Sequence, residues 1–157
     1  MQLSILTPGK LKKSYLREGC DEYLARLLRY TRIQVLEVRE EPVLKGIDAL
    51  QVKRREGARL LEKVAPGTFL VTLDEHGENP DSMALAELLR HHRDRGQKEL
   101  AFVIGGPLGL APEVLQRGQL KLSLSAMTLP HELVRLILLE QLYRAFTILQ
   151  GEPYHNP

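Results

Sequence analysis

Two short segments in the last third of the chain combine residue types that can bind a ligand and accept a proton. Residues 104–110 read IGGPLGL and directly follow an apolar, strand-like run at residues 100–104. The backbone N–H groups of such a turn open at the carboxyl edge of a sheet, where open α/β sheets bind their ligands. Residues 122–131 read LSLSAMTLPH, which places small and hydroxyl side chains just before a histidine that starts a long apolar helix. Together the two segments predict a binding site with a proton-accepting group beside it.

The spacing of the glycines argues against two familiar nucleotide sites. Gly105 and Gly106 with Gly109 match neither G-x-G-x-x-G nor a P-loop, because no Gly-Lys-Ser/Thr follows. The turn also follows the fourth expected strand and not the first, which disfavours a nicotinamide-binding domain. A plain bend with one glycine at positive φ is the alternative to a binding turn. Two adjacent glycines additionally let the backbone approach a flat ligand closely.

His131 is the first candidate for a catalytic base. It stands at the start of a helix, where the helix dipole lowers the pKa of an imidazole and favours its neutral, proton-accepting form. A surface or capping histidine is the alternative. In the segment before it, Ser123 and Ser125 are expected on one side of a strand, and Thr128 is expected to cap the helix.

Arg135 and Tyr154 are the other candidate catalytic residues. On a helical wheel, Arg135 and His131 share a face with apolar residues such as Leu138. A cation on such a stripe is paired, packed against a ligand or placed at an interface, so a buried salt bridge, a dimer contact and a catalytic role all stay open. Tyr154 follows the helix stop at Gly151, in a tail that either frays or folds over the site to stack on a base.

Composition sets limits on the class of protein. The 157 residues suffice for one domain with a real core, and a formal charge of +2 gives little information about partners. One cysteine, Cys20, forms no internal disulfide, which fits a reducing cytoplasm. We expect no metal site, since no His, Cys and carboxylate cluster has ligand spacing, and no membrane span. Among the basic runs, residues 10–13 with Arg17 are the best candidate for a phosphate contact.

Strand-like and helix-like segments alternate along the chain, which predicts an α/β domain with a mostly parallel sheet flanked by helices. Strands are expected at residues 3–7, 33–38, 68–73, 100–104 and 120–124. Helices are expected at residues 14–28, 47–64, 81–92, 112–117 and 130–149. We see no internal repeat and no linker, so residues 1–157 are expected to form one domain.

At these motifs the chain resembles the RlmH-type ribosomal RNA large-subunit methyltransferases, members of the SPOUT (α/β-knot) superfamily. The resemblance covers essentially the whole chain. It is densest in three segments, residues 102–107, 122–131 and 140–146, and it extends to the ending at residues 152–155 and to the opening at residues 6–12. Leu108 is a departure, because the family's turn often carries a polar residue there.

The resemblance implies a fold, a cofactor and a reaction. The C-terminal segment would thread through a preceding loop as a trefoil knot, an exception to the rule against threaded chains. The cofactor would be S-adenosylmethionine, bound by residues of three segments: Leu73, Gly105, Gly106, Leu124, Ser125, Ala126, Met127, Thr128 and Leu129. A homodimer would pack through the last helix. The reaction would be methylation of N3 of a pseudouridine in helix 69 of 23S rRNA, on the assembled ribosome.

Two other functions remain open from the residues alone. One is a SPOUT methyltransferase acting on transfer RNA or on another ribosomal base, because fold and cofactor do not fix the substrate. The other is a non-catalytic RNA-binding or ribosome-associated module without a cofactor.

Overall fold

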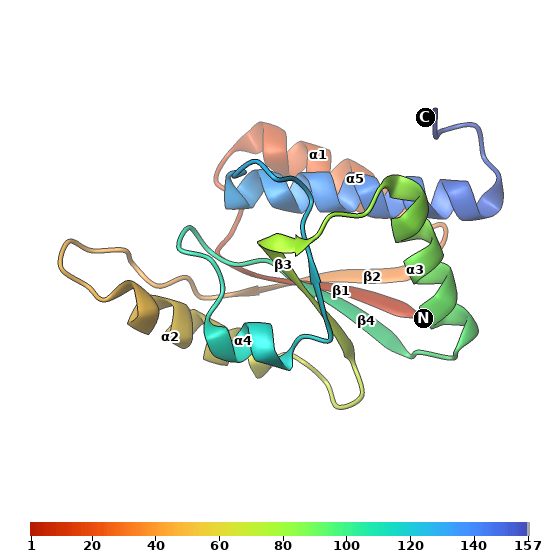
Figure 1. Ribbon diagram of the computed structural model, residues 1–157. Coiled ribbons are helices and arrows are strands. Elements are labelled where there is room, and N and C mark those ends of the chain that lie inside the picture. Colours follow the sequence, from red (N-terminus) through yellow and green to blue (C-terminus); the bar gives the residue numbers. More distant parts are fainter. Residues whose placement is uncertain (157) are drawn as a thin grey trace.

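Five parallel strands form one sheet between two layers of helices (Figure 1). The computed structural model describes residues 1–156. The strands are β1 (Gln2–Pro8), β2 (Arg32–Val38), β3 (Phe69–Glu78), β4 (Glu99–Val103) and β5 (Leu120–Leu122). The helices are α1 (Ser14–Leu27), α2 (Ala49–Leu61), α3 (Ser82–Asp94), α4 (Pro112–Arg117) and α5 (His131–Gln150). The order of strands in the sheet is β2-β1-β4-β3-β5.

The central strands are apolar on both faces because helices cover both faces. Leu3, Ile5 and Phe102 pack under α1, α3 and α5, whereas Leu6 and Val103 pack under α2 and α4. Each residue of these five is at most 1% exposed. Because all five strands are parallel, their carboxyl ends lie along one edge of the sheet. The two cores hold the strands in place.

The element boundaries differ from the sequence expectations mainly near this edge. The strand expected at residues 68–73 continues as β3 to Glu78, and the strand expected at residues 120–124 ends at Leu122. The helix expected at residues 130–149 is α5, His131–Gln150. Thr128 does not cap it: the N-cap position is Pro130, with no side-chain cap, so that expectation was wrong. No helix within residues 1–156 combines the length and the apolar character that crossing a membrane requires.

Candidate cofactor and catalytic site

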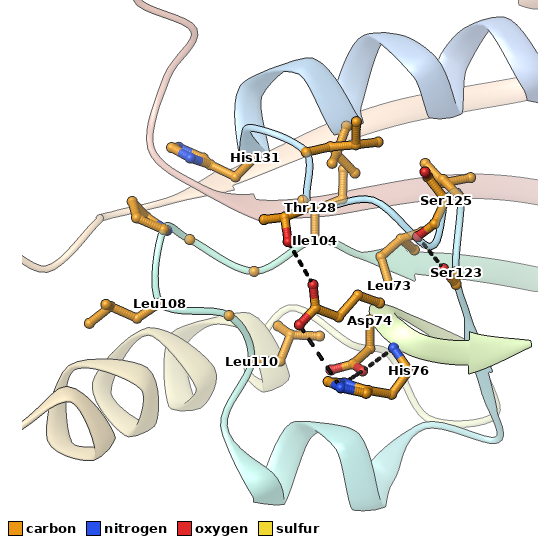
Figure 2. Close-up of a pocket in the computed structure, with 18 of the residues that line it drawn as sticks. Leu73, Asp74, His76, Ile104, Leu108, Leu110, Ser123, Ser125, Thr128 and His131 are labelled. Carbon is orange, nitrogen blue, oxygen red and sulfur yellow. Dashed lines mark hydrogen bonds and ion pairs between the residues drawn. The ribbon is translucent and has the colours of Figure 1, made fainter.

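A cavity of about 480 Å³ opens at the carboxyl ends of β3, β4 and β5 (Figure 2). This volume lies within the range of small-molecule sites, about 300–1,000 Å³. Most of its walls come from three chain segments: residues 73–76 after the regular part of β3, residues 104–110 after β4, and most of residues 122–131, from the end of β5 to the start of α5. The cavity thus lies at the sheet edge that the sequence motifs predicted.

The glycine-rich turn closes on itself, which explains its glycines. Gly109 has φ +84°, and its N–H donates to the carbonyl oxygen of Gly106 at 2.9 Å. A Cβ added to Gly105 would lie 2.7 Å from the carbonyl carbon of Gly109. A Cβ on Gly106 would lie 2.8 Å from Oε2 of Glu56, a buried carboxylate on α2. The turn's own backbone therefore leaves no room for a side chain at Gly105, before any ligand is considered, while a side chain at Gly106 would displace the Glu56 carboxylate.

An irregularity in β3 brings acidic residues to the cavity. Leu73 and Glu78 both pair with Leu122 of β5, so the residues between them bulge out of the ladder. A Cβ on Gly77 would lie 2.7 Å from the backbone of Leu122, which shows how closely the strands approach there. Bulges of this kind commonly re-aim side chains beside functional sites. Here the bulge directs Asp74 toward the cavity wall, together with its neighbours Glu75 and His76.

The segment between β5 and α5 is held by its own hydroxyl groups. Ser123 donates its side-chain proton to the carbonyl oxygen of Ser125 at 2.8 Å, and Ser125 Oγ accepts from the N–H of Met127 at 2.9 Å. Thr128 donates to a carboxylate oxygen of Glu75 across the cavity at 3.1 Å. Ser123 and Ser125 thus lie in a braced loop and not on one side of a strand, as the sequence pattern had suggested.

His131 stands at the start of α5, on the side of the cavity nearest Leu108, with Ser123 and Ser125 on the other side (Figure 2). Its side chain is partly buried, and burial lowers the pKa of its imidazole below the ordinary value. Nearby charges act in both directions: Glu132 and Glu40 raise this pKa, while Lys12 and Arg135 lower it. The imidazole is therefore neutral at pH 7 and able to accept a proton.

Arg135 lies in the core beside the site and not in the cavity wall. It is 4% exposed, its Nη1 donates to Glu37 at 2.6 Å, and its Nη2 donates to the carbonyl oxygen of Gly9 at 3.0 Å. Its Nε is buried without a hydrogen-bond partner among the residues described. Of the roles that the sequence left open, the structure supports the buried salt bridge within the chain.

Tyr154 follows the end of α5, whereas His131 begins this helix. Figure 1 shows the C-terminal tail at the end of α5 away from α2 and α4. Its hydroxyl donates to Glu140 at 3.1 Å and lies 3.3 Å from the hydroxyl of Tyr23, while the Arg144 guanidinium sits 4.8 Å from its ring centre. The tail is thus ordered and packed on α5, not frayed. Burial raises the pKa of the Tyr154 phenol well above its usual range, which makes it a proton donor and a poor base.

Comparison with protein-family models matches residues 1–155 to a family described as predicted SPOUT methyltransferase. The chain belongs to the SPOUT methyltransferase family. A ribosomal RNA large subunit methyltransferase H from Carboxydothermus hydrogenoformans is 48% identical over 159 residues, covering 99% of this chain and 100% of that protein. The protein of the same name from Syntrophotalea carbinolica is 47% identical, and the match covers 99% of this chain and 99% of that protein.

Solved structures agree with this family at the level of the fold. A probable methyltransferase from Bordetella pertussis Tohama I superposes with a TM-score of 0.54 at 15% identity, over 92% of this chain and 95% of that one. The family model and these relatives confirm the resemblance read from the motifs. The parallel sheet and this superposition confirm the α/β fold class. As a SPOUT family member, the protein is a methyltransferase that uses S-adenosylmethionine.

Most of the residues predicted to bind the cofactor of this SPOUT protein line the cavity. They are Leu73, Gly105, Gly106, Leu124, Ser125, Met127, Thr128 and Leu129, joined by the predicted base His131. Ala126, Arg135 and Tyr154 are not in its lining. The lining fits S-adenosylmethionine in kind, because it combines apolar walls, the main chain of a glycine turn, and carboxylates that can accept from ribose hydroxyls or an ammonium group.

Several lining residues of the SPOUT site were missed in the sequence. The sequence did not predict three of them, Asp74, Glu75 and His76, because the alternation of residues along a strand does not show a bulge. A carboxylate directly after an apolar run was a signal that could have been used. Lys53 on α2 also lines the cavity, although its basic run is typical of a solvent-exposed helix face. Within residues 1–156, no three His, Cys, Asp or Glu side chains come together to hold a metal ion.

We expect Arg135→Ala to destabilise this SPOUT domain without weakening cofactor binding. The substitution leaves Glu37 without its partner and opens space in the core, which costs about 2–3 kcal/mol of unfolding free energy. Urea unfolding measures the loss, and calorimetry with S-adenosylmethionine measures the affinity. Arg93→Ala, which removes an exposed ion pair, is the control and should change stability by less than about 1 kcal/mol. Unchanged stability with lost turnover would return Arg135 to a catalytic role.

Proposed function

We propose that the protein methylates N3 of a pseudouridine in helix 69 of large-subunit 23S rRNA, on the assembled ribosome. The observation that carries the proposal is the joining of two motifs in one cavity, the glycine turn and the segment 122–131, with a neutral imidazole beside them. The relatives' name, ribosomal RNA large subunit methyltransferase H, supports the RNA target. Their near-complete overlap with residues 1–157 supports one domain that performs the whole reaction.

We assign cofactor binding to the main chain of the glycine turn and to residues 124–129. S-adenosylmethionine supplies an activated methyl group, so the protein's task is to hold donor and acceptor at short range in the correct orientation. The self-closed turn and the serine-braced loop suit this task because neither rearranges easily. The trefoil knot belongs to this proposal: residues 120–131 would be the threaded segment and residues 104–110 part of the loop around it.

His131 is assigned the proton transfer. An imide nitrogen such as N3 is nucleophilic only after it loses its proton, so a base must lie within hydrogen-bond reach. His131 lines the cavity and its lowered pKa keeps it unprotonated near neutral pH. No role as base is assigned to Tyr154, since its raised pKa suits a hydrogen-bond donor or a stacking surface.

The pH dependence of the reaction follows from the same pKa. Since burial lowers the pKa of His131 from its ordinary value of 6.5, most of the imidazole is neutral at pH 7, and it becomes protonated as the pH falls through the lowered pKa. We expect single-turnover rates, measured from about pH 5 to pH 8, to fall on the acid side with a midpoint below 6.5. A flat profile, or a midpoint above 6.5, would contradict the assignment.

A homodimer through α5 is the proposed active form. His131 begins α5 and Tyr154 follows its end, and a helix of 20 residues is about 30 Å long, so one chain cannot bring both to one cavity. Two α5 helices packed antiparallel about a twofold axis would bring the tail of one protomer toward the cavity of its partner. Partly exposed apolar residues on this layer, Leu133 and Leu136, and the exposed Tyr15 on α1, suit such a contact.

Mixed dimers test this arrangement. We expect His131→Ala and a chain truncated after Pro153 to be nearly inactive alone. After co-refolding in equal amounts, about half of the dimers are mixed and each carries one intact site, so about a quarter of wild-type activity returns. Each variant refolded with itself is the control. If no activity returns although mixed dimers form, the sites are not shared between protomers.

The substrate is tested by comparing methyl transfer to intact ribosomes, protein-free 23S rRNA and transfer RNA, with labelled S-adenosylmethionine. We expect transfer to ribosomes alone. Transfer to transfer RNA would replace the proposed substrate by that one, and no transfer to any RNA would overturn the proposal. The proposed place of action is the cytoplasm, where ribosomes assemble, and the free, buried thiol of Cys20 is compatible with it.

A further inference from the structure

The loop between β1 and α1, residues 9–13, lies beside the cavity and carries lysines that the reaction scheme does not use. We propose that this loop is a phosphate-binding arm, in which Lys10 and Lys13 contact RNA backbone phosphates next to the nucleotide that enters the cavity. The proposal rests on the proposed function in one respect, that the substrate is RNA.

The loop is unusually well anchored for a surface connection. Three of its main-chain groups bond to side chains of the flanking helices: Gly9 O accepts from Arg135 Nη2 (3.0 Å), Leu11 O accepts from Arg17 Nη2 (3.1 Å), and Lys12 N–H donates to Glu132 Oε1 (2.6 Å). A fourth bond joins the N–H of Gly9 to the carbonyl oxygen of Val38 at 2.9 Å. The side chain of Leu11 is buried in the main core. The backbone that carries the lysines is thus fixed before any partner arrives.

The anchors also place the loop at the site. Glu132, which holds the N–H of Lys12, directly follows His131 in the first turn of α5. Lys12 is near enough to influence the pKa of His131. A polynucleotide whose base reached His131 would therefore pass this loop with its backbone.

The charges of the loop divide into one paired and two unpaired lysines. Lys12 Nζ lies 3.2 Å from a carboxylate oxygen of Glu40. Lys10 and Lys13 are exposed and have no carboxylate oxygen within 4 Å in the part of the chain that the structure describes. Unpaired ammonium groups on a rigid loop suit phosphate, because binding costs neither a salt bridge nor loop ordering.

The number of phosphate contacts can be measured from the salt dependence of RNA binding. Each phosphate neutralised by a lysine releases condensed counterions, and the logarithm of the binding constant then falls with the logarithm of salt by about 0.7–0.9 per contact. Loss of both lysines should therefore reduce the magnitude of this slope by about 1.5.

The experiment measures sedimentation of the protein with purified ribosomes over a series of potassium chloride concentrations. Lys10→Ala/Lys13→Ala is compared with Lys63→Ala/Lys98→Ala, which removes the same charge from exposed lysines near the opposite, amino-terminal edge of the sheet. We expect the magnitude of the salt slope of ribosome binding to decrease by about 1.5 only for the first pair, with unchanged affinity for S-adenosylmethionine. Equal slopes for both pairs, or wild-type binding without salt dependence, would overturn the proposal. Salt-dependent binding without methylation would refute the proposed function and leave the arm standing.

A second pair of variants separates anchoring from charge. Glu132→Gln and Glu132→Ala both remove a negative charge near the RNA, but only glutamine keeps an oxygen that can accept from the N–H of Lys12. If the anchored loop presents the lysines, the alanine variant binds ribosomes more weakly than the glutamine variant, by several-fold. Equal affinities would show that the anchor has no part in binding.

Discussion

Replacing His131 by alanine is expected to lower the single-turnover rate of methyl transfer by about 100- to 10,000-fold, the usual contribution of a positioned base. The effect is large because the other imidazole of the cavity wall, His76, is exposed and already paired, with its Nδ1 3.2 Å from a carboxylate oxygen of Asp74. Asp74 and Glu75 are already engaged with His76 and Thr128, and burial keeps the Tyr154 phenol protonated. Rapid-quench assays with saturating ribosomes and cofactor measure the chemical step directly.

Two comparisons make the result specific to the base. Affinity for S-adenosylmethionine, measured by calorimetry, should stay close to wild type, since the glycine turn and the braced loop are untouched. His91→Ala removes an exposed histidine from α3, remote from the cavity, and should leave the rate unchanged. A His131→Ala rate near that of wild type would remove this residue from the mechanism.

The second large effect is expected from Gly105→Ala, which should weaken S-adenosylmethionine binding by tenfold or more, about 1.4 kcal/mol. The new methyl group would lie 2.7 Å from the carbonyl carbon of Gly109, and a backbone atom cannot swing aside as a flexible side chain can. The turn must open to make room, and the hydrogen bond from Gly109 to Gly106 is strained or lost. Calorimetry gives the affinity and urea unfolding gives the stability.

Gly67→Ala is the matched control for this experiment. Gly67 has φ +79°, so an alanine there is strained by about 1 kcal/mol, but its Cβ meets no atom within 4 Å and it lies away from the cavity. Both variants should lose stability, and only Gly105→Ala should lose cofactor affinity. Wild-type affinity in Gly105→Ala would mean that this turn does not shape the binding site.

The motifs and their order along the chain were enough to predict the fold class and most of the cavity wall. Strands that are apolar on both faces and alternate with helices indicate a parallel sheet, and a sheet of this kind opens its site at the carboxyl edge. From this alone, the turn at residues 104–110 and His131 were expected at the same edge. The strands that carry these two segments are held side by side by the two cores. The apolar residues that form the cores can be recognised in the sequence.

What the sequence could not predict depends on tertiary contacts. The bulge that exposes Asp74 arises from the close approach of Gly77 to Leu122, a contact between strands about 45 residues apart in the chain. The role of Arg135 depends on Glu37, a partner nearly 100 residues away, so the helical wheel could show only that the cation needed one. The sequence left a plain bend and a binding turn open for the glycines, and it could not show that Gly105 lies against the backbone of Gly109 or that Gly106 lies against Glu56.

The most direct test of the account is to map the methylated nucleotide. Ribosomes lacking the modification are incubated with the protein and S-adenosylmethionine carrying a heavy methyl group, and nuclease fragments of their 23S rRNA are analysed by mass spectrometry. We expect one heavy methyl group, on N3 of a pseudouridine in helix 69, and none with the His131→Ala variant. A label on any other nucleotide, or an unlabelled 23S rRNA, would contradict it.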